Sequence, residues 1–258
     1  MLDLPRFERD AETFLRALNR QHYLHGAGLQ PTLDLTTLYD DFTYLFREET
    51  YGELQEAQAE PKPKRYLSDF VATGFLDDHV KVLTERLAAS EAGATVTWDD
   101  RALPYRSVPA AIANEPDAHR RHELDARYRA TLATLNPLYE ERHRTLLESA
   151  PALDAGDYVT LSDSHKELGL ADLADAMERF LEVTEQAYFG ALEELLGTIE
   201  LAPADAARCD LAWLFRAPHL DTAFPARDLV ATLYRGCASW AWTCATRPTS
   251  SSTRKRGR

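Results

Sequence analysis

The balance between helix-favouring and β-branched residues constrains the fold of this chain most. Leu (37) and Ala (38) far outnumber Val (8) and Ile (2) among its 258 residues. Leu and Ala favour helices, whereas β-branched residues favour strands. Gly, which a turn-rich β fold needs, is scarce at 11. The composition therefore predicts a mainly α fold and argues against a sandwich, a barrel or a parallel sheet.

Hydrophobic periodicity places the helices of a multi-helix array. Apolar residues recur at i, i+3 and i+4 over long segments that Gly and Pro separate. Asn114-Glu-Pro-Asp117 is typical of a helix start, because it combines a capping side chain with Pro and acids in the first turn. The predicted helices cover about residues 10–23, 35–54, 67–87, 117–146, 158–161, 170–195, 203–214 and 225–233.

One segment has the pattern of β structure. Ala94-Thr-Val-Thr-Trp98 alternates, Asp99-Asp-Arg101 is suited to a turn, and Leu103-Pro-Tyr105 completes the segment. We expect one small β-hairpin at about residues 94–105, with Pro104 on an edge strand.

Charge divides the chain into two parts. The net charge is -13, yet all 42 acidic residues lie at or before Asp228, and the last 30 residues carry six basic ones. Such an acidic body repels phosphate, so nucleic acid is not expected as a partner of the body. We predict a helical domain over residues 1–235 and a disordered or irregular C-terminal tail over residues 236–258.

The sequence also predicts a cytoplasmic protein that has no membrane segment. Its charged N-terminus lacks the apolar region of a signal peptide, and no apolar run approaches the roughly 18–20 residues that span a bilayer. Its three cysteines, Cys209, Cys237 and Cys244, make no disulfide framework.

Two pairs of histidines are candidate metal ligands. His119 and His122 stand three apart, as do His22 and His25 at the end of a predicted helix. A zinc site needs three or four ligands. Arg120, Arg121 and Glu123 surround the first pair, which favours a solvated helix face over a metal site.

No other motif completes an active site. The motif HExxH, a phosphate-binding glycine loop and GxSxG are all absent from the sequence. Cys209 is expected in the core, since free Cys is usually buried. The acidic pairs Glu48-Glu49 and Glu193-Glu194 are expected on the surface. We therefore predict no catalytic, cofactor-binding or metal-ligating residue in this chain.

Four segments together resemble a known enzyme family. The segments 93–105, 114–124, 208–218 and 221–225 are similar to stretches of oligoendopeptidase-type zinc metallopeptidases, of the thimet oligopeptidase superfamily. The resemblance covers about residues 10–235. It implies a helical bowl around a deep channel in which an intact relative hydrolyses peptides.

The resemblance also implies where the chemistry of that family resides. Two His of an HExxH motif and a downstream Glu hold zinc, and the motif Glu activates water. This sequence has none of those positions, so no catalytic residue carries over to it. The chain is predicted to be the N-terminal part of such a protein, to be inactive alone and to hold no zinc, which is expected only in an intact relative.

A frameshift near Arg235 or Gly236 is our explanation of the tail. In the frame that joins the third base of each codon to the first two bases of the next, the codons of residues 239–244 encode apolar-Gly-apolar-Asp-apolar. The two Trp residues determine this pattern, because Trp has the single codon TGG. That pattern resembles the next stretch of sequence in members of the family. The alternatives are a solvated basic tail, or an arm that binds an acidic partner or nucleic acid.

Two further hypotheses stay open for the whole chain. One is a helical binding or scaffold protein without enzymatic activity. The other is a metal-dependent bundle that uses His119 and His122, although it lacks the paired Glu-x-x-His motifs of such bundles. For a peptidase fragment, the apolar surface that would pack on the missing half is expected to be exposed and to promote self-association.

Overall fold

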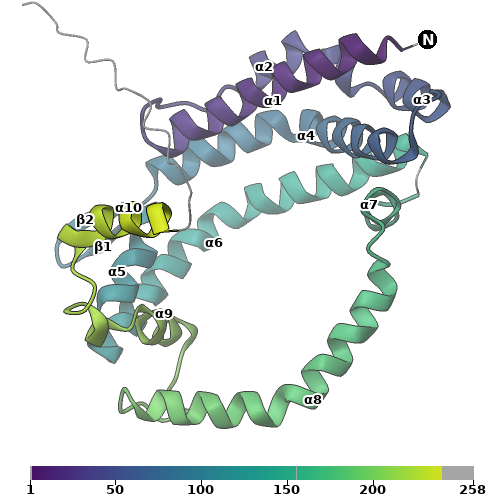
Figure 1. The fold of residues 1–258 in the computed structure, drawn as a ribbon. Coiled ribbons are helices and arrows are strands. Elements are labelled where there is room, and N and C mark those ends of the chain that lie inside the picture. Colours follow the sequence, from purple (N-terminus) through teal and green to yellow (C-terminus); the bar gives the residue numbers. More distant parts are fainter. Residues whose placement is uncertain (1, 155, 240–258) are drawn as a thin grey trace, which may run out of the picture.

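A computed structural model describes residues 2–154 and 156–239, and this part of the chain is mainly helical (Figure 1). Its α-helices are α1 (Leu4–Gly26), α2 (Leu35–Asp41), α3 (Glu48–Glu56), α4 (Pro61–Gly93), α5 (Val108–Asn114), α6 (Ala118–Ser149), α7 (Tyr158–Lys166), α8 (Leu170–Gly197), α9 (Arg208–Arg216) and α10 (Leu229–Ser239). The predicted fold class is confirmed. Of the predicted tail, residues 240–258 lie outside the described residues, whereas α10 continues past residue 235 to Ser239.

The predicted hairpin is present at the predicted place. Strands β1 (Thr95–Trp98) and β2 (Arg101–Pro104) pair antiparallel, with Thr95 opposite Pro104. Asp99 and Asp100 form the turn with positive φ, which Asp tolerates better than most residues.

Local capping explains where several helices begin. The carboxylates of Asp3, Asp117 and Asp157 each accept a hydrogen bond from a backbone N–H three residues on. The Asp3 cap lets α1 begin at Leu4, earlier than the predicted residue 10. Helix α9 begins at Arg208 rather than near residue 203, because the carboxylate of Asp210 holds the N–H of Ala207.

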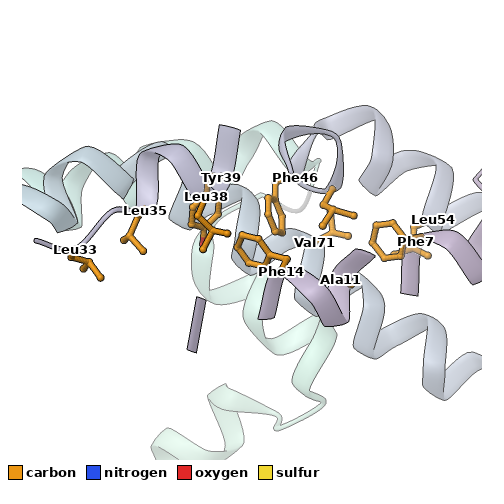
Figure 2. Close-up of a cluster of buried hydrophobic side chains, with 11 residues drawn as sticks. Phe7, Ala11, Phe14, Leu33, Leu35, Leu38, Tyr39, Phe46, Leu54 and Val71 are labelled. Carbon is orange, nitrogen blue, oxygen red and sulfur yellow. The ribbon is translucent and has the colours of Figure 1, made fainter. Parts of the chain in front are cut away.

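The largest hydrophobic cluster joins α1, α2, α3, α4 and the 3-10 helix η1 (Thr43–Phe46), as Figure 2 shows. Phe14 of α1 lies at its centre, with edge-on ring contacts to Tyr39, Phe42 and Phe46 at centroid distances of 5.0, 5.7 and 4.7 Å. Such aromatic pairs add stabilisation beyond their buried area. Gly74 of α4 lets the ring of Phe46 lie directly against the helix backbone.

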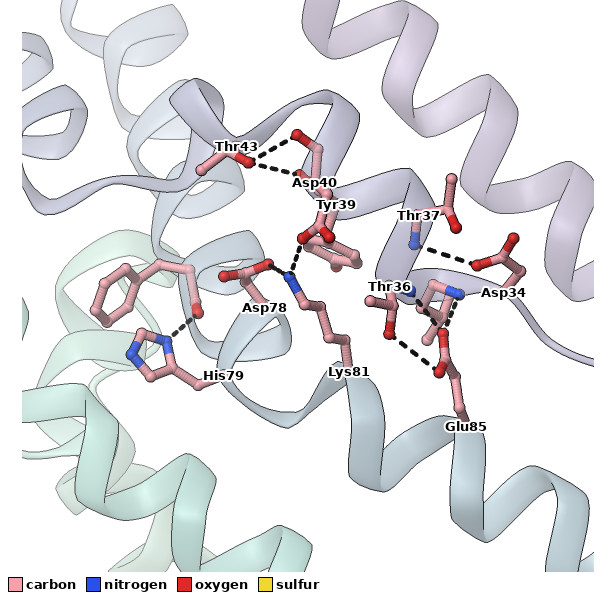
Figure 3. Close-up of polar contacts among 12 residues, drawn as sticks. Asp34, Thr36, Thr37, Tyr39, Asp40, Thr43, Asp78, His79, Lys81 and Glu85 are labelled. Carbon is pink, nitrogen blue, oxygen red and sulfur yellow. Dashed lines mark hydrogen bonds and ion pairs between the residues drawn. The ribbon is translucent and has the colours of Figure 1, made fainter.

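Polar contacts fix α2 on α4 (Figure 3). Glu85 of α4 accepts hydrogen bonds from the N–H groups of Leu35 and Thr36 at 2.5 and 2.6 Å, so it caps α2 from a neighbouring helix. Lys81 of α4 bridges Asp40 and Asp78 at 2.7 and 2.8 Å. These groups satisfy one another, which makes the cluster a structural contact.

Two smaller clusters extend the body of the molecule. One lies among α4, α7 and the 3-10 helix η3 (Ala150–Leu153). The other joins the hairpin to α5, α6 and α9 through Val96, Val108, Ile112, Leu124 and Cys209. Between α4 and α6, Arg142 donates to the hydroxyl of Thr84 at 2.8 Å.

Helix α8 departs from this body. Figure 1 shows it leaving α7 and running towards α9 without a neighbouring helix along most of its length. Leu196 is its single buried residue. Over residues 170–238, the other buried residues are Cys209 and Asp210 of α9. No helix of the described residues is both long and apolar enough to cross a membrane.

Candidate functional site

Arg121 of the segment His119-Arg-Arg-His122 lies in the core, which corrects the prediction of a solvated face at this residue, whereas His119 and Glu123 are exposed as that prediction expects. Arg121 is among the most buried side chains, with 2% of its surface exposed. Its Nε and Nη2 donate to Oδ1 of Asp210 at 2.9 and 2.7 Å, and its Nη1 donates to the carbonyls of Glu115 and Pro116. From the sequence, a charged side chain such as this one is expected on the surface. Its burial has no local signal, because its partner lies 89 residues further along the chain.

His122 joins these two buried side chains from a half-buried position. Its Nε2 lies 2.7 Å from Oδ2 of Asp210, which also accepts from the N–H of Ala207 at 2.7 Å. Burial alone would raise the pKa of Asp210, but the hydrogen bonds from Ala207, His122 and Arg121 outweigh burial and lower it. The carboxylate is thus ionised and fully hydrogen-bonded, and it ties α9 to α6. We call Arg121, His122 and Asp210 the α6–α9 latch.

The latch geometry does not suit a metal ion. Donor atoms of His122, Cys209 and Asp210 lie within 4.8 Å of one another, the one such group among the described residues. Two ligands of a tetrahedral zinc lie about 3.3 Å apart, given bond lengths near 2 Å. The distance of 2.7 Å from His122 to Asp210 is instead that of a hydrogen bond. Burial also raises the pKa of the Cys209 thiol, which disfavours the thiolate that binds metals.

The remaining candidates from the sequence do not assemble into a site. His119 and His22 are exposed. His25 is buried, with its Nε2 3.5 Å from the guanidinium of Arg106. Cys209 lies in the core as predicted. The acidic pairs Glu48-Glu49 and Glu193-Glu194 are exposed, also as predicted.

A small polar cavity lies between α4 and α7, where the sequence predicts no site. It has a volume of about 110 Å³ and is lined by Asp69, Thr73, Asp77, Ser162 and His165, among others. Nε2 of His165 lies 2.9 Å from the hydroxyl of Tyr51, and Nδ1 lies 4.0 Å from Asp69. Burial lowers the pKa of His165. A cavity of this size and polarity suits a few water molecules rather than an organic ligand.

A signal for His165 is present in the sequence. It stands four residues after Leu161, on the face of α7 that meets α4. The helical period that predicts burial for Leu161 therefore also predicts it for His165.

An exposed apolar stripe runs along α8. Its members have between 41% and 65% of their surface exposed and stand at helical spacing: Leu173, Met177, Phe180, Leu181, Tyr188 and Leu195. We call this set the α8 stripe. The apolar period that predicts the helix is thus present, and the described part of the chain offers it no partner to pack against along the stripe.

A groove lies at the C-terminal end of the stripe. It has a volume of about 730 Å³, and its lining includes Leu195, Ile199, Trp213, Phe215 and Pro218. The guanidinium of Arg121 lies 5.7 Å from the centre of the Trp213 ring. The α6–α9 latch therefore fixes one wall of this groove, which we call the Trp213 groove.

Comparisons with known proteins give no family assignment. A scan against protein-family models finds no match, and searches of curated proteins and of solved structures find none either. The functional argument therefore depends on the geometry of the α8 stripe and the Trp213 groove.

Proposed function

We propose that this chain is the helical N-terminal part of an oligoendopeptidase-like zinc metallopeptidase. In this proposal the chain forms one wall of a channel for peptides. A separate zinc-bearing half covers the α8 stripe and the Trp213 groove. The observation that carries the proposal is α8 itself, a 28-residue helix with one buried residue and a continuous exposed apolar stripe.

Physical chemistry supports a covering partner for this helix. An isolated helix is marginal in water, and most helical stability in proteins comes from packing of an apolar face. Contiguous exposed apolar surface on a monomer marks an interaction site. The exposure continues beyond α8 to Phe215, Phe224 and Leu233. A long surface of this kind fits an internal interface better than a small-ligand site.

The described residues of this chain do not fit a catalytic zinc ion. The sequence lacks HExxH, and the donor atoms of His122 and Asp210 are committed to the α6–α9 latch. We therefore derive no catalytic step here and assign the metal and the catalytic groups to the covering half. The chain alone is proposed to hydrolyse no peptide.

Reading the gene beyond the codon of residue 235 tests the proposal. We expect an open frame that encodes HExxH, shifted relative to the printed tail. Coexpression of the chain with that downstream polypeptide should give a complex that contains zinc and cleaves an internally quenched peptide. The chain alone is the control and should do neither. One tightly bound zinc per isolated chain, or no HExxH frame downstream, would contradict the proposal.

The second candidate is a helical binding or scaffold protein, which the preformed Trp213 groove favours. Capture of one defined partner, with no catalytic frame downstream, would support it over the peptidase.

In both candidates we propose a cytoplasmic protein, because Cys209 carries a free thiol that suits a reducing compartment. The acidic surface makes peptides or proteins, and not nucleic acid, the proposed partners.

A further inference from the structure

We propose that the segment covering the α8 stripe is an amphipathic helix whose apolar face is flanked by Lys or Arg. This inference rests on the proposed function, in which a separate half of the protein covers α8. It adds the chemistry by which that segment is recognised. Three features of the described residues carry it: the charge around the stripe, the secondary structure of the surface and the shape of its C-terminal end.

The charge around the stripe selects a basic occupant. Helix α8 carries seven acidic residues and one basic residue, Arg179. Glu178 and Glu185 are exposed and stand three and four residues from Leu181, which places them along its border. A second copy of this chain would bring the same acids against them. Like charges across an interface are unfavourable, whereas Lys or Arg there would be complementary.

The groove end of the stripe is also acidic. Glu193 and Glu194 precede Leu195, and Glu200 lines the groove. The nearby cation Arg216 is bound to both carboxylate oxygens of Asp221 at 2.6 and 2.7 Å, so it does not offset this charge. The basic flanks of the occupant are therefore needed at this end as well.

The secondary structure of the surface selects a helix. The N–H and C=O groups of α8 are used within the helix, so the surface offers no strand edge for an extended peptide. The members of the stripe recur at intervals of three, four and seven residues, that is at one or two helical turns, which is the spacing that a second helix matches. The 28 residues of α8 span about 42 Å, so a partner helix of similar length covers the stripe. The Trp213 groove then receives one large apolar side chain as an anchor.

Matched peptides and matched variants of the full chain test this inference. Two synthetic 25-residue helical peptides share one Leu- and Phe-rich face and differ in their flanks, Lys in one and Glu in the other. Calorimetric titration should show the Lys peptide binding at least about tenfold more tightly. The double variant Glu178→Lys/Glu185→Lys should lose about tenfold in affinity for it. The control Glu48→Lys/Glu49→Lys changes net charge equally on α3 and should lose less than about twofold.

Three outcomes would overturn the inference. Equal losses of affinity in the two double variants would mean that peptide binding depends only on the net charge of the chain. Equal affinities of the two peptides would show that basic flanks play no part in recognition of the stripe. A dimer of the unmodified chain at micromolar concentration that Phe180→Asp abolishes would show that a second copy covers the stripe. Helicity by circular dichroism confirms that each variant folds. The downstream reading frame decides the proposed function separately.

Discussion

At the scale of single residues, the α6–α9 latch is a buried ion pair on which stability is expected to depend. Arg121 and Asp210 have 2% and 0% of their side-chain surface exposed. Removing one partner of such a pair leaves a buried charge without compensation. Because the partners stand on α6 and α9, the loss would also loosen the wall of the Trp213 groove.

We expect Asp210→Ala to lower the free energy of unfolding by about 3–5 kcal/mol, since it leaves the buried Arg121 guanidinium without a counter-charge. Urea unfolding followed by circular dichroism measures this change. The control is Asp221→Ala, which removes an exposed partner of Arg216 and should change stability far less than Asp210→Ala does. Similar losses in the two variants would mean that the latch is no stronger than a surface ion pair.

His165 is expected to make stability depend on pH. Burial lowers its pKa from the ordinary value of 6.5, so the folded state favours the neutral ring that contacts Tyr51. The unfolded chain therefore binds a proton first as pH falls. The stabilisation is complete above about pH 6.5 and declines below it. Urea unfolding at pH 7 and pH 5 should show this decline, and His165→Gln should reduce it. His143→Gln, at an exposed position, should leave the decline unchanged.

At the scale of elements, periodicity in the sequence carries most of the fold. It places most of the helices and the hairpin because burial of one face repeats locally, although it predicts no helix at α5. Cys209 is placed in the core by the usual burial of free Cys. The burial of Arg121 has no local signal, because it depends on an acid 89 residues away. Long-range contacts of this kind leave no trace in the pattern of neighbouring residues. The start of α9 has a local determinant instead, because the carboxylate of Asp210 accepts from the N–H of Ala207 three residues before it, and apolar periodicity does not register such a cap.

Gly74 shows how closely α4 packs on η1. A Cβ at this position would overlap the ring of Phe46, which is held in the aromatic cluster around Phe14. Gly74→Ala should therefore lower the free energy of unfolding by about 1–3 kcal/mol, despite the higher helix propensity of Ala. Gly190→Ala in α8 meets open space and should stabilise the helix by roughly 0.5–1 kcal/mol. Thermal unfolding compares the two, and a gain at position 74 would contradict the tight packing.

At the scale of the whole molecule, the chain consists of a packed body and an exposed arm. The hydrophobic clusters lie almost entirely between residues 7 and 161, with Cys209 as the contribution of α9. Residues 170–238 continue the apolar period of the body yet bury little of it. The sequence predicts the stripe on α8 but not its exposure, because a period shows that a face is apolar and does not show what covers it. The proposed function and the proposed helix with Lys or Arg flanks both explain this asymmetry between a packed body and an exposed apolar arm.

The same asymmetry predicts how the molecule exchanges its amide hydrogens. Opening free energy rises with the number of buried apolar contacts around a segment. In the isolated chain, amides of α8 should therefore exchange at least about a hundredfold faster than those of α1 and α4. Hydrogen exchange read by mass spectrometry measures this difference. The covering half, or the Lys-flanked peptide, should slow α8 selectively and leave α6 unchanged as an internal control. Protection of α8 equal to that of α4 in the isolated chain at nanomolar concentration would show that the stripe needs no partner, and both proposals for this surface would fail.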